Sequence, residues 1–137
     1  MIKNIILATL VAFGLVGCSA NIENGTPEEI AEYVFIEAIK GNKSNYMPLL
    51  DDEISELSLK KIVRGGSYYL DSAKDPAKWE LKIVRSNEKA SMVKIEVYAK
   101  NKTAIDESDH LREYRKDYDA QYTFEKQDGK WKISLVY

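Results

Sequence analysis

Residues 118–137, YDAQYTFEKQDGKWKISLVY, decide the fold of this chain. Apolar and aromatic residues alternate with polar ones on both sides of Asp128-Gly129. This alternation is typical of half-buried strands, and Asp-Gly between two such runs is a strong signal for a hairpin turn. The stretch therefore predicts two antiparallel strands. Their inward-facing residues are predicted to be Tyr118, Ala120, Tyr122 and Phe124 in the first strand and Trp131, Ile133, Leu135 and Tyr137 in the second.

Two more strands are expected upstream of this hairpin, because residues 79–83 and 93–99 show the same alternation. Asn87-Glu88-Lys89 between them predicts a second hairpin turn. The inward-facing residues are predicted to be Trp79, Leu81 and Ile83 in the first strand and Val93, Ile95, Val97 and Ala99 in the second. A densely charged connection, 101–116, then leads to the final hairpin.

A helix is expected before the sheet, starting at Thr26-Pro27-Glu28-Glu29. Thr can cap the first turn, Pro suits the first helical position, and Glu29 can return a hydrogen bond to the cap. An apolar stripe at helical spacing follows and ends before Gly41. Its members are Ile30, Ala31, Val34, Phe35, Ala38 and Ile39.

Two further helices are predicted before the first strand. One is a short helix or turn at 45–50, in which Pro48 indicates that the helix starts near that residue or is distorted. The other spans 52–64 and ends at Gly65-Gly66. Helices followed by four antiparallel strands indicate a single α+β domain over 26–137, with the helices packed on the apolar face of the sheet.

The composition excludes several classes of partner. The 20 basic and 22 acidic residues are interspersed and give a net charge of −2, so we expect no nucleic-acid partner. A chain of 137 residues is one domain in length. Its single cysteine, Cys18, has no partner for an intramolecular disulfide.

The N-terminus has the anatomy of an export signal. Lys3 is followed by an uncharged run, 5–16, and by small residues ending at Cys18. At roughly 1.5 Å per residue, a helix of this length is too short for a hydrocarbon core of about 30 Å. We therefore expect residues 1–17 to be a signal peptide that is removed.

Leu15-Val16-Gly17-Cys18 resembles the lipobox of bacterial lipoproteins. The resemblance implies that the Cys18 thiol receives a diacylglyceryl group, that cleavage makes Cys18 the first mature residue, and that 18–25 is a short polar tether. Ser19 resembles the second residue of lipoproteins sent to the outer membrane in Gram-negative cells. The alternative is an ordinary cleaved signal, or an uncleaved anchor, in which Cys18 is incidental.

The order of elements is similar to that of small exported lipoprotein domains of the nuclear transport factor 2-like (cystatin-like) superfamily. The resemblance is carried by Thr26-Pro27-Glu28-Glu29, by Gly41-Asn42 followed by 46–50, and by 128–133 (DGKWKI). It implies a cone formed by a curved four-stranded sheet and its helices. Members use the pocket of this cone as an enzyme site or as a binding site, so the fold does not choose between them.

The tyrosines and tryptophans raise the question of a ligand pocket. The candidate ligand-binding residues are Tyr68, Tyr69, Trp79, Tyr118 and Tyr122. Aromatic residues at alternate strand positions are also what a sheet needs in order to pack on helices, so we expect most of them to be core residues.

His110 follows Asp106, Glu107 and Asp109, which makes a metal site or a general base conceivable. We instead expect a solvated acidic loop, because transition-metal sites usually recruit more than one His or Cys and hard-ion loops have a ligand spacing that this segment lacks. The sequence therefore predicts no metal, no cofactor and no identifiable catalytic residue.

These patterns together predict a cell-envelope lipoprotein, anchored to the membrane through Cys18 and located in the outer membrane if the cell is Gram-negative. Its domain is expected to bind a small apolar ligand or another envelope protein without catalysis. The alternative is a pocket enzyme, an isomerase or hydratase acting on an apolar small molecule, which would need a buried carboxylate beside a Tyr donor.

Overall fold

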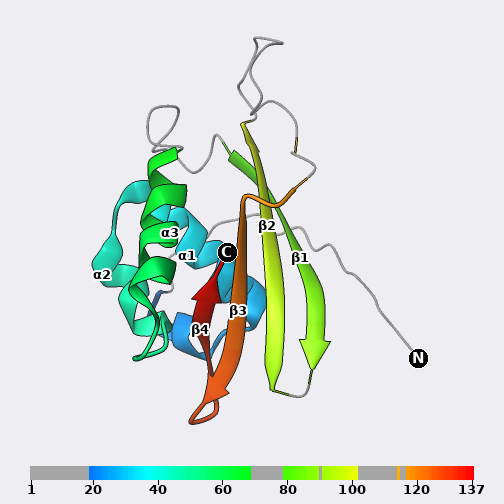
Figure 1. Ribbon diagram of the computed structural model, residues 1–137. Coiled ribbons are helices and arrows are strands. Elements are labelled where there is room, and N and C mark those ends of the chain that lie inside the picture. The colour runs from blue at the N-terminus through cyan, green and yellow to red at the C-terminus, as the bar shows by residue number, and fades with distance from the viewer. Residues whose placement is uncertain (1–18, 69–78, 90, 102–113, 115–116) are drawn as a thin grey trace, which may run out of the picture.

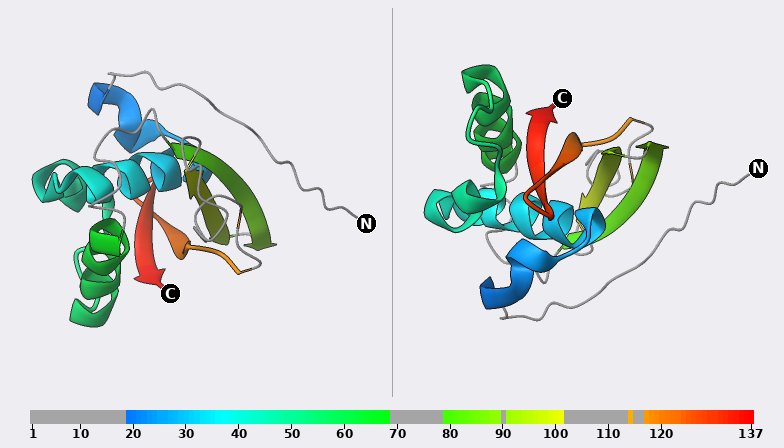
Figure 2. Two further views of the ribbon diagram at one scale, coloured as in Figure 1. Left: turned by 90° about the horizontal axis from the view of Figure 1, so that it is seen from above. Right: turned by 90° about the horizontal axis from the view of Figure 1, so that it is seen from below.

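The computed structural model describes residues 19–68, 79–89, 91–101, 114 and 117–137. In chain order the elements are η1 (Ser19–Asn24), α1 (Pro27–Lys40), α2 (Lys43–Tyr46), η2 (Met47–Leu49), α3 (Glu56–Tyr68), β1 (Trp79–Lys89), β2 (Met92–Asn101), β3 (Ala120–Gln127) and β4 (Lys130–Val136). The strands form one open antiparallel sheet in the order β1-β2-β3-β4, and the helices lie on one side of it (Figures 1 and 2). The predicted α+β class and strand order are confirmed.

Helix α1 begins and ends as predicted. The Thr26 hydroxyl accepts a hydrogen bond from the Glu29 N–H at 3.2 Å, and the Thr26 N–H donates to Glu29 Oε1 at 2.9 Å. Gly41 ends the helix with a φ of 80°, which lies in the left-handed region that favours glycine. This local chemistry fixes where α1 begins and ends.

The core lies between α1 and the sheet. The side chains with 0% exposure are Ile30, Ala31, Val34, Ile95, Val97, Ala99, Phe124 and Ile133. They come from α1 and from β2, β3 and β4, so both predicted apolar faces meet in one cluster. Each fully buried Val, Ile or Phe side chain contributes roughly 1.5–3 kcal/mol.

The inner face of β4 differs from the predicted one beyond Ile133. Leu135 is 37% exposed and Tyr137 is 51% exposed, whereas Val136 is only 2% exposed. The prediction that Leu135 and Tyr137 face the core was therefore wrong.

The cause is an extra residue in β4. Phe124 pairs with Ile133, but the preceding residue, Thr123, pairs with Leu135, so Ser134 has no partner of its own. A bulge of this kind reverses the alternation of faces beyond it. Because it depends on how two strands pair, the sequence of β4 alone does not indicate it.

The predicted limits of the third helix and the predicted position of the first hairpin turn were also wrong. Helix α3 starts after Ser55, whose hydroxyl accepts a hydrogen bond from the Ser58 N–H at 3.1 Å, and it continues through Gly65-Gly66. Glycine costs a helix only about 1 kcal/mol per residue, and α3 packs against α1. Residues 87–89 do not form a turn, because β1 continues to Lys89, which pairs with Met92.

The segment between α1 and α3 covers the free edge of β4. The predicted helix at 45–50 is divided into α2 and η2, with Pro48 in η2. Leu50 then forms a parallel bridge with Ile133, and the Val136 N–H donates to Ser58 Oγ at 3.0 Å. This edge of the sheet is therefore blocked by the chain itself.

Replacing Thr123 by Val is expected to stabilise the domain. The Thr123 side chain is buried, and its hydroxyl has no hydrogen-bond partner among the described residues. Replacing an unsatisfied hydroxyl by a methyl should raise the free energy of unfolding by about 1 kcal/mol.

Thr26→Val is the matched control. It removes the cap of α1 and should lower the free energy of unfolding by about 1 kcal/mol. Urea unfolding measures both variants, and a loss of stability in Thr123→Val would contradict this interpretation of the buried hydroxyl.

Candidate functional site

The space between α1, α3 and the end of the sheet is where a cone-shaped fold would hold a ligand. The cavity found there measures about 20 Å³. One water needs roughly 10–15 Å³ on this measure, whereas ligand pockets usually hold several hundred. The cavity lining is formed by Phe35, Ala38, Lys61, Ile62, Asp119, Ala120, Tyr122, Val136 and Tyr137.

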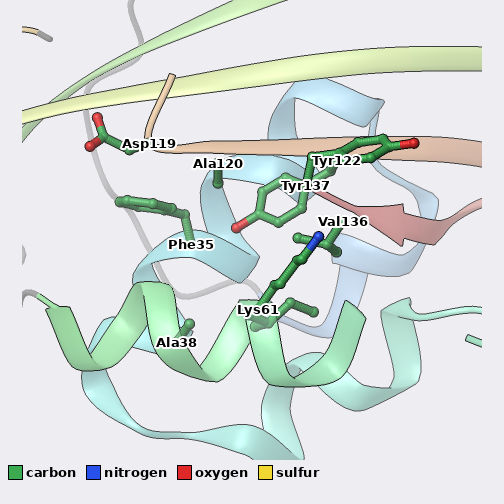
Figure 3. Close-up of a pocket in the computed structure, with 9 residues that line it drawn as sticks. Phe35, Ala38, Lys61, Asp119, Ala120, Tyr122, Val136 and Tyr137 are labelled. Atoms are coloured by element: carbon green, nitrogen blue, oxygen red, sulfur yellow. The ribbon is translucent and has the colours of Figure 1, made fainter. Parts of the chain in front are cut away.

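Aromatic side chains occupy most of this space. Figure 3 shows the Tyr137 ring lying across the gap between α3 and β3, with its hydroxyl directed toward the side of Phe35. The Tyr122 hydroxyl points the other way (Figure 3). Lys61 Nζ lies 5.3 Å from the centre of the Tyr137 ring, a cation–π contact that helps to hold the ring in place.

Asp119 brings a carboxylate to the same cavity. Its Oδ2 accepts a hydrogen bond from the Ala99 N–H at 2.7 Å, and its own N–H donates to the Val97 carbonyl at 2.8 Å. These bonds tie the start of β3 to β2. Asp119 and Tyr122 both line the cavity, but the Asp119 carboxylate and the Tyr122 hydroxyl lie at opposite ends of it (Figure 3), and the cavity is one water in size. They are not arranged as the carboxylate and Tyr donor of an isomerase site.

The structure separates the residues proposed as ligand contacts. Tyr122 lines the cavity, whereas Tyr118 precedes β3, is half-buried and is not among the lining residues. The side chains of Tyr68 and Trp79 lie outside the described part of the structure. Tyr69, and likewise Cys18 and His110, lie wholly outside the described residues.

Sequence reasoning missed three of the residues that meet at the cavity. Phe35 belongs to the predicted stripe of α1 but was not assigned to a pocket, and Lys61 and Asp119 carried no distinguishing pattern. Only the packing of α3 against α1 and the register of β3 bring them together.

A second group of side chains lies on the outer face of the sheet, opposite the described helices. Lys82 Nζ is 4.6 Å from the centre of the Tyr98 ring and 4.9 Å from that of Tyr114. Lys100 Nζ lies 4.8 Å from the Tyr114 ring and 3.9 Å from Glu80 Oε1. We call these five residues, Glu80, Lys82, Tyr98, Lys100 and Tyr114, the Lys–Tyr cluster.

The strand register assembles this cluster. Lys82 is paired with Tyr98, and Glu80 is paired with Lys100, so two cross-strand pairs stand next to each other on one face. Tyr114 covers them from the connection between β2 and β3. No binding role was assigned to any of these five residues from the sequence.

Both cluster tyrosines remain protonated at neutral pH. Burial, with a hydrogen bond to Glu96 and the charge of that carboxylate, raises the pKa of Tyr98 to about 12. Burial and the neighbouring Glu80 likewise raise the pKa of Tyr114 to about 12. The cluster therefore presents neutral hydroxyl groups, ring faces and charges of both signs.

Two glutamates of α1 have pKa values shifted in opposite directions. Burial raises the pKa of Glu32 from 4.5 to about 7, and the nearby Glu29 adds to this rise. Burial also acts to raise the pKa of Glu37, but hydrogen bonds from Asn45 and Asn42 outweigh it, with help from Lys40, and the pKa is lowered.

The Glu37 contacts are structural. Its Oε1 accepts hydrogen bonds from Asn42 Nδ2 and Asn45 Nδ2, each at 2.9 Å, and its Oε2 lies 3.3 Å from Lys40 Nζ. This network ties the end of α1 to α2. Among the described residues, no group of His, Cys, Asp and Glu is arranged to hold a metal ion.

Comparisons with protein families find no match, and comparisons with curated proteins find no similar sequence. Within the described part of the chain, none of the helices has the length and apolar character needed to cross a bilayer.

Glu32→Gln and Glu37→Gln should change the pH dependence of stability in opposite ways. Because the folded state raises the pKa of Glu32, its carboxylate destabilises the fold increasingly as pH rises from 4.5 to about 7. Glu32→Gln should therefore gain stability relative to the wild type above pH 7 and match it at acidic pH.

Glu37→Gln is the control with the opposite sign. The lowered pKa of Glu37 means that its contribution is present above 4.5 and is lost as pH falls below that value. The variant should therefore lose stability at neutral pH and approach the wild type in acid. Urea unfolding from pH 4 to 8 measures both, and parallel curves for the wild type and Glu32→Gln would contradict the interpretation of Glu32.

Proposed function

We propose that this chain is a lipid-anchored protein of the bacterial cell envelope. The support is Leu15-Val16-Gly17-Cys18, together with the preceding uncharged run, 5–16. One acyl chain gives only marginal membrane binding, whereas the two of a diacylglyceryl group hold a protein stably. Cys18 is the only cysteine, so it alone can carry the thioether-linked lipid.

We further propose that the domain binds another envelope protein, without catalysis, through the Lys–Tyr cluster. The observation that carries this proposal is the contact of Lys82 Nζ with both the Tyr98 ring and the Tyr114 ring on a sheet face opposite the described helices. Tyrosine supplies large contact area at low entropic cost and is enriched in protein interfaces. The 20 Å³ cavity favours this outer surface over the interior as the place of binding.

The charges of the cluster favour a protein partner. Two lysines are accompanied by Glu80, and Glu96 lies beside them as the acceptor of the Tyr98 hydroxyl at 2.8 Å. Such a balance does not attract the phosphates of nucleic acid. It is suited to a polypeptide surface with its own mixture of donors and acceptors.

We also infer that the domain has the cone architecture of the nuclear transport factor 2-like superfamily, with its interior filled. The support is the curved sheet, most evident at β1 in Figure 2, with α1 and α3 on the inner side. Under this proposal the side chains of Phe35, Tyr122 and Tyr137 occupy the volume that a ligand takes in pocket-bearing members.

Replacing Cys18 by Ala should abolish lipid attachment. Mass spectrometry of the mature N-terminus is expected to show a peptide that starts at Cys18 and carries a diacylglyceryl mass in the wild type. The Cys18→Ala variant should keep its leader or appear in the soluble fraction. A wild-type peptide that starts elsewhere, or that carries no acyl mass, would contradict the anchor.

Lys82→Glu combined with Tyr98→Ser should disconnect the domain from its partner. Cross-linking in intact envelopes, followed by purification, is expected to recover a stoichiometric protein partner with the wild type. Loss of two interface anchors costs more than 1.4 kcal/mol, so recovery should fall about tenfold or more. Lys60→Glu, at an exposed position of α3, is the matched control and should leave recovery unchanged. Equal recovery with the cluster variant would refute the assignment.

A further inference from the structure

The segment after Cys18 is docked on the domain. Helix η1 (Ser19–Asn24) starts one peptide bond after Cys18 and contacts α1 and β4. Ile22 packs against the hydrophobic core, and Glu23 Oε1 lies 3.4 Å from Lys130 Nζ. The composition of the predicted tether, 18–25, gave no sign of this attachment.

Gly25 holds η1 close to the start of α1. Its N–H donates to the Ile22 carbonyl at 2.9 Å, and a Cβ at this position would lie 3.0 Å from Glu29 Oε1 and 3.1 Å from Ile22 O. A side chain at this position would therefore be in tight contact with both groups, and each would have to shift by a few tenths of an ångström. The chain is therefore attached to the domain from η1 onward, and one peptide bond separates Cys18 from this attached segment.

A hollow of about 240 Å³ lies between η1 and the β3–β4 hairpin. Lys126, Lys130 and Trp131 line it on the hairpin side, and Glu23 lines it on the η1 side. Lys126 Nζ stands 5.2 Å from the centre of the Trp131 ring. Trp and Lys are the residues that place an apolar body and a polar tip at a membrane–water interface.

We propose that this hairpin face, formed by Glu23, Lys126, Lys130 and Trp131, lies on the headgroup layer of the bilayer that holds the Cys18 lipid. The inference rests on the lipid anchor proposed above. At roughly 2 Å per residue, η1 sets the Ser19 and Ile22 Cα atoms about 6 Å apart. Cys18 is joined to Ser19 by one peptide bond, and adjacent Cα atoms are about 3.8 Å apart, so covalent geometry alone limits the Cys18–Ile22 separation to about 10 Å. A domain of this size has a radius of gyration of about 13 Å. Because the link is shorter than this radius, it cannot bring another face of the domain to the membrane.

The charges of the hairpin face assign separate roles to the lipid and to the protein. The face carries two lysines and one glutamate, and each lysine adds only about 1 kcal/mol at an anionic surface. The acyl chains therefore supply the affinity, and the face supplies the orientation.

Trp79, the first residue of β1, lies at the end of the sheet opposite the hairpin face. The last residue of β1, Lys89, pairs with Met92, and Met92 pairs with Glu125 beside the β3–β4 hairpin, so it is the Lys89 end that lies near this face.

This orientation also places the Lys–Tyr cluster toward the end of the sheet that is remote from the bilayer. The 11 residues of β1 span about 35 Å at roughly 3.3 Å each. Glu80 and Lys82 lie in the half of β1 that starts at Trp79. The proposed partner-binding surface is thus held away from the lipid headgroups.

Fluorescence quenching with two single-tryptophan variants tests the orientation. Residues 18–137, which contain the entire core cluster, are coupled through Cys18 to a maleimide lipid in phosphatidylcholine vesicles that carry a nitroxide on some headgroups. Trp79→Phe reports Trp131, and Trp131→Phe reports Trp79. Trp131 should be quenched several-fold more strongly than Trp79.

A flexible insertion between Cys18 and Ser19 provides the control. Ten Gly/Ser residues give a link of about 17 Å with no preferred direction, so quenching of Trp131 should fall toward that of Trp79. Equal quenching of the two tryptophans without the insertion, or quenching of Trp131 that the insertion does not change, would overturn the proposal. Chemical coupling makes this result independent of acylation in the cell, which the mass spectrum of the mature N-terminus decides separately.

Discussion

Burial of the α1 stripe against β2 and β3 is the contact on which the rest of the structure depends. Ile30, Ala31 and Val34 have no exposed surface, and they meet Ile95 and Val97 of β2, which also have none. Because α1 is capped at Thr26 and ended at Gly41, its stripe has a fixed length and direction. Helices α3 and η1 each pack against α1 and β4, so their positions depend on where α1 lies on the sheet.

The same contact explains why the interior and the exterior of the domain differ in kind. With α1 seated on the sheet and α3 packed against α1, the buried rings of Phe35 and Tyr122 and the half-exposed ring of Tyr137 line a remaining gap of about 20 Å³. No described helix covers the opposite face of the sheet, and there the cross-strand pairs of β1 and β2 build the Lys–Tyr cluster. The side chains of this cluster face away from the core, and η1, which follows Cys18 in the sequence, is docked against α1 and β4.

Local patterns in the sequence predicted the elements, but not the features that depend on how they pair. The Thr26–Glu29 capping box involves residues three apart, and the buried faces of β2 and β3 follow from simple alternation. The bulge at Ser134 depends on the pairing of β4 with β3, so the sequence misplaced Leu135.

The Lys–Tyr cluster escaped prediction for the same reason. A turn at 87–89 would have paired Ser86 with Ala90 and hence Lys82 with Lys94. In the structure the strand continues to Lys89, and Lys82 instead meets Tyr98. An error of a few residues in one turn thus hides which side chains of β1 and β2 meet, while the predicted core face of β2 remains correct.

The interior of the domain is occupied by its own side chains, and the cavity left between α1, α3 and the sheet measures about 20 Å³. A titration of the domain with indole, followed by two-dimensional ¹H–¹⁵N NMR, tests whether an apolar ligand can enter. A filled interior gives no saturable shift of the amide signals of Phe35, Val136 and Tyr137. Saturable shifts confined to these residues would show that the interior opens to an apolar ligand and would contradict it.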